Sequence, residues 1–309
     1  MLLYGLAKIG NPAFEDDADM AAPTTWDITA SVNGVNEVST SEFQSAGDGI
    51  PSTRSLRQNV TADAGGNIAI ARQRFSIPDL LAIARENDVE LAIAASLKAE
   101  AQEGFNNALL RFRQYDGTSD TPGEGSLQAA PSERLFTAAG PVWHLFIGAA
   151  KIAAGTTRID VELVYDIARD GFNAGGSVWW DRVVAGGLVD FDKRFRGGFS
   201  SRLEAGVGVN EGDGETELVR TRGPRTRVDC RVANIMQGSR LALELRAFNR
   251  WLGRGVGFCS LWRDRDLLTN ADEHYQKTYV DRRFRVRMPS GPTRRDYDFR
   301  FIASQEANA

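Results

Sequence analysis

The amino-acid sequence predicts an all-β, mainly antiparallel fold: a jelly-roll β-sandwich followed by a smaller β-rich domain with one amphipathic helix. Three observations lead to this class. Several short segments alternate apolar and polar residues with a period of two, which is typical of strands with one buried face. Turn-forming stretches such as Asp116–Gly123 and Asp170–Gly176 separate them. No long helical pattern lies between these segments, which favours a sandwich.

The predicted strand 157–165 shows the pattern most clearly, in its residues 158–165. Every second residue is apolar: Ile159, Val161, Leu163 and Tyr165. The residues between them are charged: Arg158, Asp160 and Glu162. We therefore expect one face of this strand to be buried and the other to face outward. The remaining strands of the first part are predicted at 26–32, 67–77, 89–99, 108–115, 142–153 and 177–184, with a short helical turn at 79–87.

The second part of the chain is predicted to hold strands and the one clear helix. The helix covers 239–252, where four apolar residues at i, i+4, i+7 and i+11 form one stripe: Leu241, Leu245, Phe248 and Leu252. Ser239 suits the N-cap, and Gly253 follows the helix end. The strands are predicted at 199–208, 217–232, 279–286 and 297–302.

Charge divides the 309 residues into two domains, 1–189 and 190–309. The first range holds 14 basic and 24 acidic residues, and the second holds 23 basic and 17 acidic ones. An acidic module followed by a basic one favours contact between protein surfaces of opposite charge. Acidic residues are interleaved with the arginines of the second range, so we expect no nucleic-acid binding.

Composition excludes several classes of protein. Two cysteines, Cys230 and Cys259, and two histidines, His144 and His274, are too few for a Cys/His zinc site or a disulfide framework. No apolar run approaches the roughly 20 residues needed to cross a bilayer. The first residues lack a basic n-region, so we expect no signal peptide and synthesis in the host cytoplasm.

Three segments of the first domain resemble the jelly-roll carbohydrate-binding modules of the galactose-binding-like superfamily. They are Asn11–Glu15 followed by Trp26, then Ala154–Leu163, then Ser177–Val183. In that family the opening Glu and the closing Asp often help to bind a structural calcium ion, and the matching residues here are Glu15 and Asp181. The resemblance therefore implies a structural Ca²⁺, whose hard oxygen ligands these would be. The alternative is that both acids lie on a solvated loop.

The second domain resembles tail-tip proteins at the distal end of siphophage and gene-transfer-agent tails. The helix from Ser239, the run Trp251–Phe258 and the segment Trp262–Asp264 carry this resemblance. It implies a virion protein that contacts other tail proteins and copies of itself, as a homo-oligomeric ring. The predicted interface residues are Arg220, Arg222, Arg225, Arg227, Trp251, Arg254 and Trp262.

Exposed aromatic residues are candidates for stacking on a cell-surface glycan. The candidates are Trp179, Tyr115, Phe105 and Phe172. Trp179 and Trp180 are neighbours on one strand and must face opposite ways, so one belongs to the core. The alternative for all four is ordinary packing in the core, where aromatic residues of strands are usually found.

No catalytic motif stands out. The chain lacks a nucleophile elbow, a P-loop and a dinucleotide-binding fingerprint, and neither histidine has a partner motif. We therefore predict a structural component of a phage or phage-like tail that displays a jelly-roll domain, without enzymatic activity. Two alternatives are open: a carbohydrate-binding adhesin or host-recognition protein, and a glycan-cleaving enzyme whose site no motif reveals.

Overall fold

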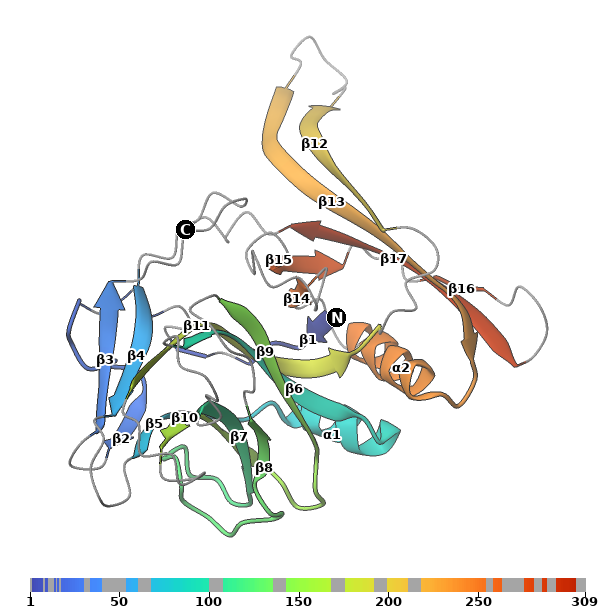
Figure 1. Cartoon of the computed structure of the whole chain (residues 1–309). Helices are drawn as coiled ribbons and strands as arrows, with labels where there is room; N and C mark the ends of the chain where they lie inside the picture. The colour runs from blue at the N-terminus through green and yellow to red at the C-terminus, as the bar shows by residue number, and fades with distance from the viewer. Residues whose placement is uncertain are drawn as a thin grey trace.

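The computed structural model (Figure 1) describes most of the chain. The described residues are 2–7, 9–10, 14, 16, 18–30, 34–40, 54–60, 68–99, 108–135, 143–167, 176–191, 199–210, 218–253, 258–262, 275–280, 285–287 and 293–303.

The first half of the chain folds into two facing antiparallel sheets. The smaller sheet has the order β2 (Asp27–Ala30), β5 (Ile68–Phe75), β10 (Arg158–Asp166), β7 (Ala108–Tyr115) and β8 (Ser132–Leu135). The facing layer consists of β3 (Gly34–Thr40), β4 (Arg54–Val60), β11 (Gly176–Val189), β6 (Glu90–Ala99) and β9 (His144–Lys151). This arrangement is the β-sandwich that the alternating segments predict.

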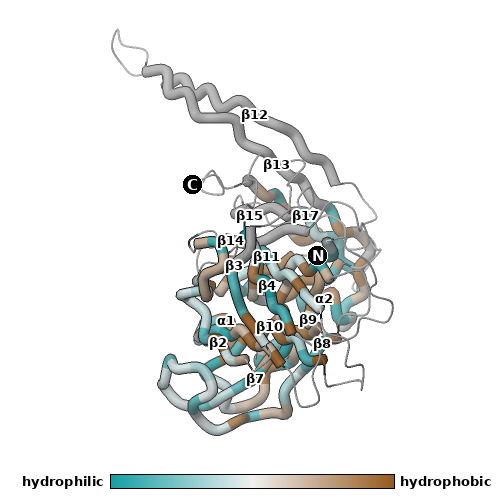
Figure 2. Tube along the Cα trace, turned by 60° about the vertical axis from the view of Figure 1, so that its left-hand side comes forward, coloured by the Kyte–Doolittle hydropathy of each residue, from teal (hydrophilic) through white to brown (hydrophobic). Residues whose placement is uncertain are grey.

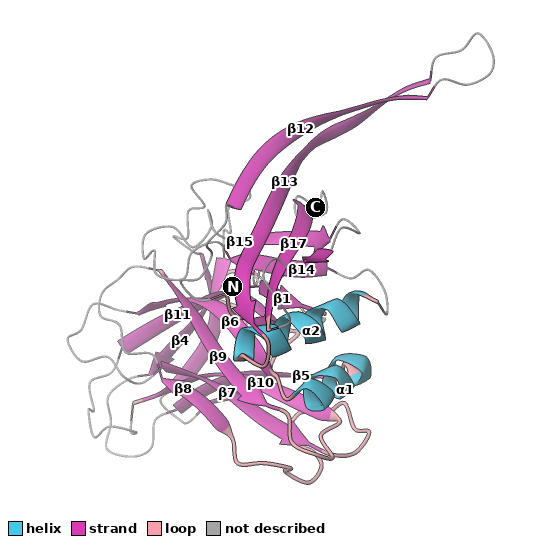
Figure 3. Ribbon diagram, turned by 90° about the vertical axis from the view of Figure 1, so that its right-hand side faces the viewer, coloured by secondary structure: helices cyan, strands magenta, loops and turns pink. Residues whose placement is uncertain are grey.

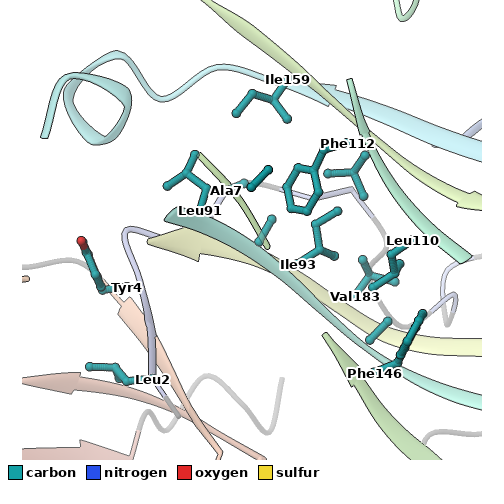
Figure 4. Packing of buried hydrophobic residues seen from close by; sticks show 14 of the residues in the cluster. Leu2, Tyr4, Ala7, Leu91, Ile93, Leu110, Phe112, Phe146, Ile159 and Val183 are labelled. Carbon is teal, nitrogen blue, oxygen red and sulfur yellow. The ribbon is translucent and has the colours of Figure 1, made fainter. Parts of the chain in front are cut away.

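The apolar core lies between the two layers. Figure 4 shows Leu110 and Phe112 of β7 on one side of this core, with Ile93 of β6 and Phe146 of β9 close to them. Trp180 is fully buried there, so it is the core member of the tryptophan pair. Hydrophobic stretches mark the sandwich strands along the chain trace in Figure 2.

A buried polar network ties the two layers together. The Trp180 indole N–H donates to Gln58 Oε1 at 2.8 Å, and Gln58 Nε2 donates to Asn36 Oδ1 at 2.8 Å. The same Gln58 amide donates across the core to the Leu163 carbonyl oxygen at 3.1 Å. Because buried polar groups are costly when unpaired, this network fixes how β4 and β11 lie over β10.

The larger layer continues into the second half of the chain through β1 (Leu2–Tyr4). β1 pairs with β11 on one side and with β14 (Phe258–Trp262) on the other. The sheet then runs through β15 (Tyr275–Val280), β17 (Arg294–Ala303), β13 (Leu218–Met236) and β12 (Phe199–Asn210), with β16 (Arg285–Arg287) beside β17. One 12-stranded sheet therefore includes strands from both sides of position 189, and the domain boundary there stays a prediction.

Two helices, α1 (Pro78–Asn87) and α2 (Arg240–Leu252), lie side by side next to the larger sheet (Figure 3). The Ser239 hydroxyl accepts from the Ala242 N–H at 3.3 Å, as predicted for an N-cap. Leu245 and Phe248 of the apolar stripe are fully buried, and the Phe248 ring lies 5.2 Å from the Tyr4 ring of β1. Neither described helix is long and apolar enough to cross a membrane.

Strands β12 and β13 extend away from the body as a two-stranded ribbon (Figures 1 and 3). β13 pairs with β17 only from Arg227 to Met236, and its remaining residues pair with β12 alone among the described strands. β12 has β13 as its sole described neighbour and stands at one end of the sheet order. We call residues 203–210 and 218–226, beyond the β13–β17 pairing, the arm.

The predicted fold class is confirmed: the chain is mainly antiparallel β with a sandwich and two short helices. The predicted strand at 279–286 overlaps the end of β15 and the start of β16, and its residues 281–284 lie outside the described residues. Five further strands were not predicted: β1, β3, β4, β8 and β14.

Candidate binding surface

Trp179 lies on the outer face of the larger sheet, in a row of residues set by strand register. Trp179 stands opposite Arg57 of β4 on one side and Lys98 of β6 on the other. Arg57 in turn stands opposite Glu37 of β3. We call Glu37, Arg57, Trp179 and Lys98 the Trp179 row; all four side chains are partly exposed.

Two cations approach the Trp179 ring from its two flanking strands. The Arg57 Cζ atom lies 5.9 Å from the ring centroid, and the Lys98 Nζ atom lies 5.2 Å from it. Both distances are within the range of a cation–π interaction. Arg57 is held in place because it donates to Glu37 Oε1 at 3.0 Å and to Ser177 Oγ at 3.3 and 3.2 Å.

Strand alternation places Trp179 outside because Trp180 is bound inside. The hydrogen bond from Trp180 to Gln58 and the burial of Val178 fix the inner face of β11 at this point. Register shifts between Asp181 and Val184, where Arg182 has a positive φ of 51°. The irregularity interrupts the pairing of β11 with β6 two residues after Trp179, and pairing resumes with Val184 opposite Ala94.

The outer face of the smaller sheet carries charges instead of open aromatic rings. Register aligns five charged residues of alternating sign across its five strands: Asp27, Arg72, Glu162, Arg111 and Glu133. Arg111 Nη1 donates to Glu162 Oε2 at 3.0 Å, and Arg113 Nε lies 3.0 Å from Glu162 Oε1. These charges are paired within the sheet, so they stabilise its outer face and neutralise one another.

Asp160 and Glu162 correct the expectation that the charged face of β10 is exposed. Both side chains are almost completely buried. Arg74 Nη2 donates to Asp160 Oδ2 at 3.0 Å, and the Gly123 N–H donates to the same oxygen at 2.7 Å. Arg74 also donates to the Glu124 carbonyl oxygen at 2.8 Å. These hydrogen bonds from Arg74 and to Asp160 therefore fix the segment 116–126 against the smaller sheet.

Tyr115 also differs from the expectation of an exposed ring. It is only 6% exposed, and the Arg74 Cζ atom lies 4.7 Å from its ring centroid. Arg74 is held in place by Asp160. Its guanidinium therefore covers a face of the Tyr115 ring on which a sugar could otherwise stack. Tyr115 is a packing residue, and sequence alone missed Arg74 because it lies on another strand.

Several predicted site residues lie outside the described residues: Phe105, Phe172, Glu15 and Arg254. Four predicted interface arginines are placed in β13, and Trp262 ends β14. Trp251 is the penultimate residue of α2 and lies near β1, with its ring 5.5 Å from that of Tyr4. These glycan and interface assignments stay predictions.

For calcium, the described residues provide Asp181 alone of the predicted pair. Asp181 is fully buried, and its Oδ1 accepts from the Arg182 N–H at 2.7 Å. Calcium takes six to eight oxygen ligands. No cluster of three acidic, histidine or cysteine side chains suited to a metal occurs within the described ranges, and the calcium assignment stays a prediction.

Glu244 and His144 are buried titratable groups with shifted pKa values. Burial raises the pKa of Glu244 on α2, although its hydrogen bonds from the Asp190 N–H and from Arg240 act in the opposite direction. Burial lowers the pKa of His144 on β9, which favours a neutral imidazole. Glu244 belongs to the contact between α2 and the end of β11, away from the Trp179 row in sequence and in strand position.

No protein-family model matches the chain, and no curated protein matches it. Solved structures give partial matches. The enzymatically active domain of bacteriophage CBA120 tailspike protein 4 matches with a TM-score of 0.40 and 11% identity, over 58% of this chain and 21% of that chain.

Two carbohydrate-binding structures match a similar share of the chain. One is from a study of promiscuous carbohydrate-binding modules of the β-sandwich superfamily, with a TM-score of 0.36 and 9% identity over 57% of this chain and 60% of that one. The other is the CBM22-1 xylan-binding domain of Paenibacillus barcinonensis Xyn10C, with a TM-score of 0.30 and 15% identity, over 56% of this chain and 89% of that chain. This chain spans about a fifth of the tailspike structure.

Proposed function

We propose that this chain is a non-enzymatic structural component of a phage-like tail, which assembles with other copies of itself and displays its β-sandwich. The observation that carries this proposal is the arm. Its two strands leave the body and pair only with each other among the described strands. A two-stranded ribbon is marginally stable alone in water, and its open edges offer backbone groups to another chain.

The register of the arm adds a charge argument. Arg220, Arg222 and Arg225 of the arm stand opposite Gly208, Gly206 and Glu204 of β12, and Arg227, directly beyond the arm, stands opposite Arg202. These β12 partners are spaced two residues apart, so the four arginine positions fall on one face of the ribbon. The irregularity between Glu204 and Gly206 compensates for the odd spacing between Arg222 and Arg225.

A second copy of the chain offers a surface of opposite charge. Residues 1–189 carry ten more acidic than basic residues, whereas residues 190–309 carry six more basic than acidic ones. An arm that docks on the acidic range of the next copy makes a head-to-tail contact, and such contacts close into rings when the rotation allows. Complementary charge also speeds the encounter between copies.

Trimming the arm tests this proposal. Leu203 stands opposite Thr226, so residues 204–225 can be replaced by Asn-Gly, a pair that suits a two-residue hairpin. Pairing between β13 and β17 from Arg227 onward is kept. Light scattering after size exclusion should give a multiple of 33.8 kDa for the intact chain and a monomer for the trimmed one.

Far-UV circular dichroism and thermal unfolding serve as the control that the trimmed body folds. High salt should shift the intact chain toward smaller species, because the contact joins opposite charges. An intact chain that is monomeric at every concentration, including when co-expressed with tail proteins, would contradict the proposal. Assembly that persists after trimming would assign the contact to another surface.

The second candidate function is carbohydrate binding by an adhesin or host-recognition protein. It is favoured by one observation, the partly exposed Trp179 ring on the outer face of the larger sheet. Aromatic rings contribute large apolar contacts, and neighbouring polar groups then supply specificity. A glycan array with the intact chain and with Trp179→Ala tests this candidate, and binding should be lost in the variant.

A further inference from the structure

We infer that Glu244 of α2 forms a pH-sensitive latch with the end of β11, and that this latch holds α2 more tightly when Glu244 is protonated. The inference concerns how α2 is joined to the β-sandwich. It goes beyond both candidate functions and does not depend on either of them.

The Glu244 side chain is almost completely buried where α2 meets the larger sheet. Its Oε2 accepts from the Asp190 N–H at 2.7 Å, directly after the last residue of β11. Its Oε1 accepts from Arg240 Nε at 2.8 Å, one turn earlier on α2. One carboxyl group therefore connects α2 to the end of this strand, and we call this contact the latch.

The ionised form of Glu244 is poorly compensated. Within the described part of the chain Arg240 is its one hydrogen-bonded cation, and the same guanidinium also binds Glu90 of β6. The Arg240 side chain is 63% exposed, so water weakens its attraction for the buried carboxylate. Burial raises the pKa of Glu244, the Asp190 charge acts in the same direction, and the two hydrogen bonds oppose this rise only in part.

Other titratable groups face this region from neighbouring elements. They are Glu90 and Lys151, opposite each other on β6 and β9, Asp88, which binds Lys151, and Glu86 of α1, which pairs with Arg250. Tyr4 of β1 packs against Phe248, one turn further along α2. Burial, together with the Glu244 charge, raises the pKa of Tyr4, so its hydroxyl stays protonated at neutral pH.

The direction of the pH effect follows from proton linkage. A carboxyl group whose pKa is raised by folding binds its proton more tightly in the latched state than in an open or unfolded one. Docking of α2 therefore gains stability as the pH falls through the raised pKa of Glu244 toward the ordinary value of about 4.3. The same stability is lost as the pH rises again.

The latch also acts on the strand that carries part of the arm. β13 ends at Met236 and α2 begins at Arg240, so a short turn joins the two elements. That turn is held in place because the Gln237 N–H donates to the Thr293 carbonyl oxygen at 2.8 Å. Mild acid should therefore hold the body end of β13 more firmly against the sandwich.

Glu244→Gln tests the latch, because an amide keeps the shape of the side chain and stays neutral at every pH. The midpoint of thermal unfolding, Tm, is measured for both chains at about pH 7.5 and about pH 5. We expect the Tm of the intact chain, minus that of the variant, to rise as the pH falls. Glu86→Gln is the matched control, since it removes a carboxylate from an exposed pair between α1 and α2, and it should keep the pH trend of the intact chain.

Hydrogen exchange measured by mass spectrometry assigns the effect to α2. After correction for the intrinsic exchange rate, protection of 240–252 relative to 108–115 should increase in the intact chain at the lower pH. It should not change with pH in Glu244→Gln.

Two results would overturn the latch. One is a Tm difference that stays constant or shrinks in acid, because it would show that the ionised carboxylate is the form that holds α2. The other is protection of 240–252 in the intact chain that stays constant or falls in acid, a result that needs no folded variant.

Discussion

At the scale of single residues, Gly187 shows how closely β1 approaches β11. A Cβ atom at Gly187 would lie 2.4 Å from Cζ of Tyr4 and 2.6 Å from its Cε2. The Tyr4 ring has little room to move, since it packs against Phe248 at 5.2 Å and Trp251 at 5.5 Å between ring centroids. Position 187 is therefore glycine because the Tyr4 ring fills the space that a side chain would need.

Gly187→Ala should lower the free energy of unfolding by about 1–3 kcal/mol, because the added methyl group overpacks this contact. Urea denaturation measures the change. Gly148→Ala on β9 is the matched control, since a Cβ there meets its nearest atom at 3.4 Å, an ordinary contact. Equal effects of the two substitutions would show that the Tyr4 ring yields to the methyl group.

For single residues, the neighbouring sequence does not decide which side chain of a pair faces the core. The doublet Trp179–Trp180 predicts one inner and one outer ring, and the structure confirms that Trp180 is buried. Which of the two is inside depends on Gln58, the distant partner that accepts the Trp180 N–H. Tyr115 was misassigned for the same reason, because Arg74 covers it from a neighbouring strand.

At the scale of elements, the segment 116–126 depends on one buried ion pair beneath it. The side chains of Arg74 and Asp160 are 1% and 0% exposed. Asp160 also accepts the Gly123 N–H, and Arg74 reaches the carbonyl oxygens of Ser119 and Glu124. Neutralising either partner leaves a buried charge without compensation.

Asp160→Asn should therefore cost about 3–5 kcal/mol of stability and loosen this segment. Cleavage after Glu124 by a glutamate-specific protease reports the loosening, and the variant should be cut faster than the intact chain. Asp120→Asn is the matched control in the same segment, because Asp120 is 90% exposed and its pair with Arg158 lies at the surface. Equal cleavage of both variants would contradict this role for Asp160.

Elements with a strong local signal could be predicted from the sequence. The alternation in 158–165 and the cap at Ser239 both correspond to observed elements. β1 was missed because three residues are too few to show a period, and its stability comes from pairing on both sides. The burial of Asp160 was missed because its partner Arg74 is far away in sequence.

At the scale of the whole molecule, one sheet includes strands from both halves of the chain. Leu3 stands opposite Leu188 on one side and Ser260 on the other. The charge step near residue 190 predicts two modules, yet charge counts carry no information about strand pairing. The arm could not be predicted for the same reason. Its two strands were predicted, but they extend from the body because β17 pairs with β13 only from Arg227 onward, and strand pairing is not visible in the sequence.

A variant that lacks residues 1–5 should disconnect β14 from β11. Hydrogen exchange measured by mass spectrometry should show loss of protection in 258–262, because β14 loses its partner β1. Protection in 108–115 should persist, since β7 pairs within the smaller sheet. Unchanged protection of β14 would mean that β15 alone holds it in place.

The position of β1 also governs when the polypeptide can finish folding on the ribosome. Leu2 and Leu3 are fully buried in the finished protein, but one of their pairing partners is β14. Such distant pairings carry a large loop-closure cost and slow the approach to the native state. Until residues 258–262 have emerged from the ribosome, the edge of β1 that pairs with β14 has no partner. This unpaired strand edge is a site where a chaperone can bind during translation.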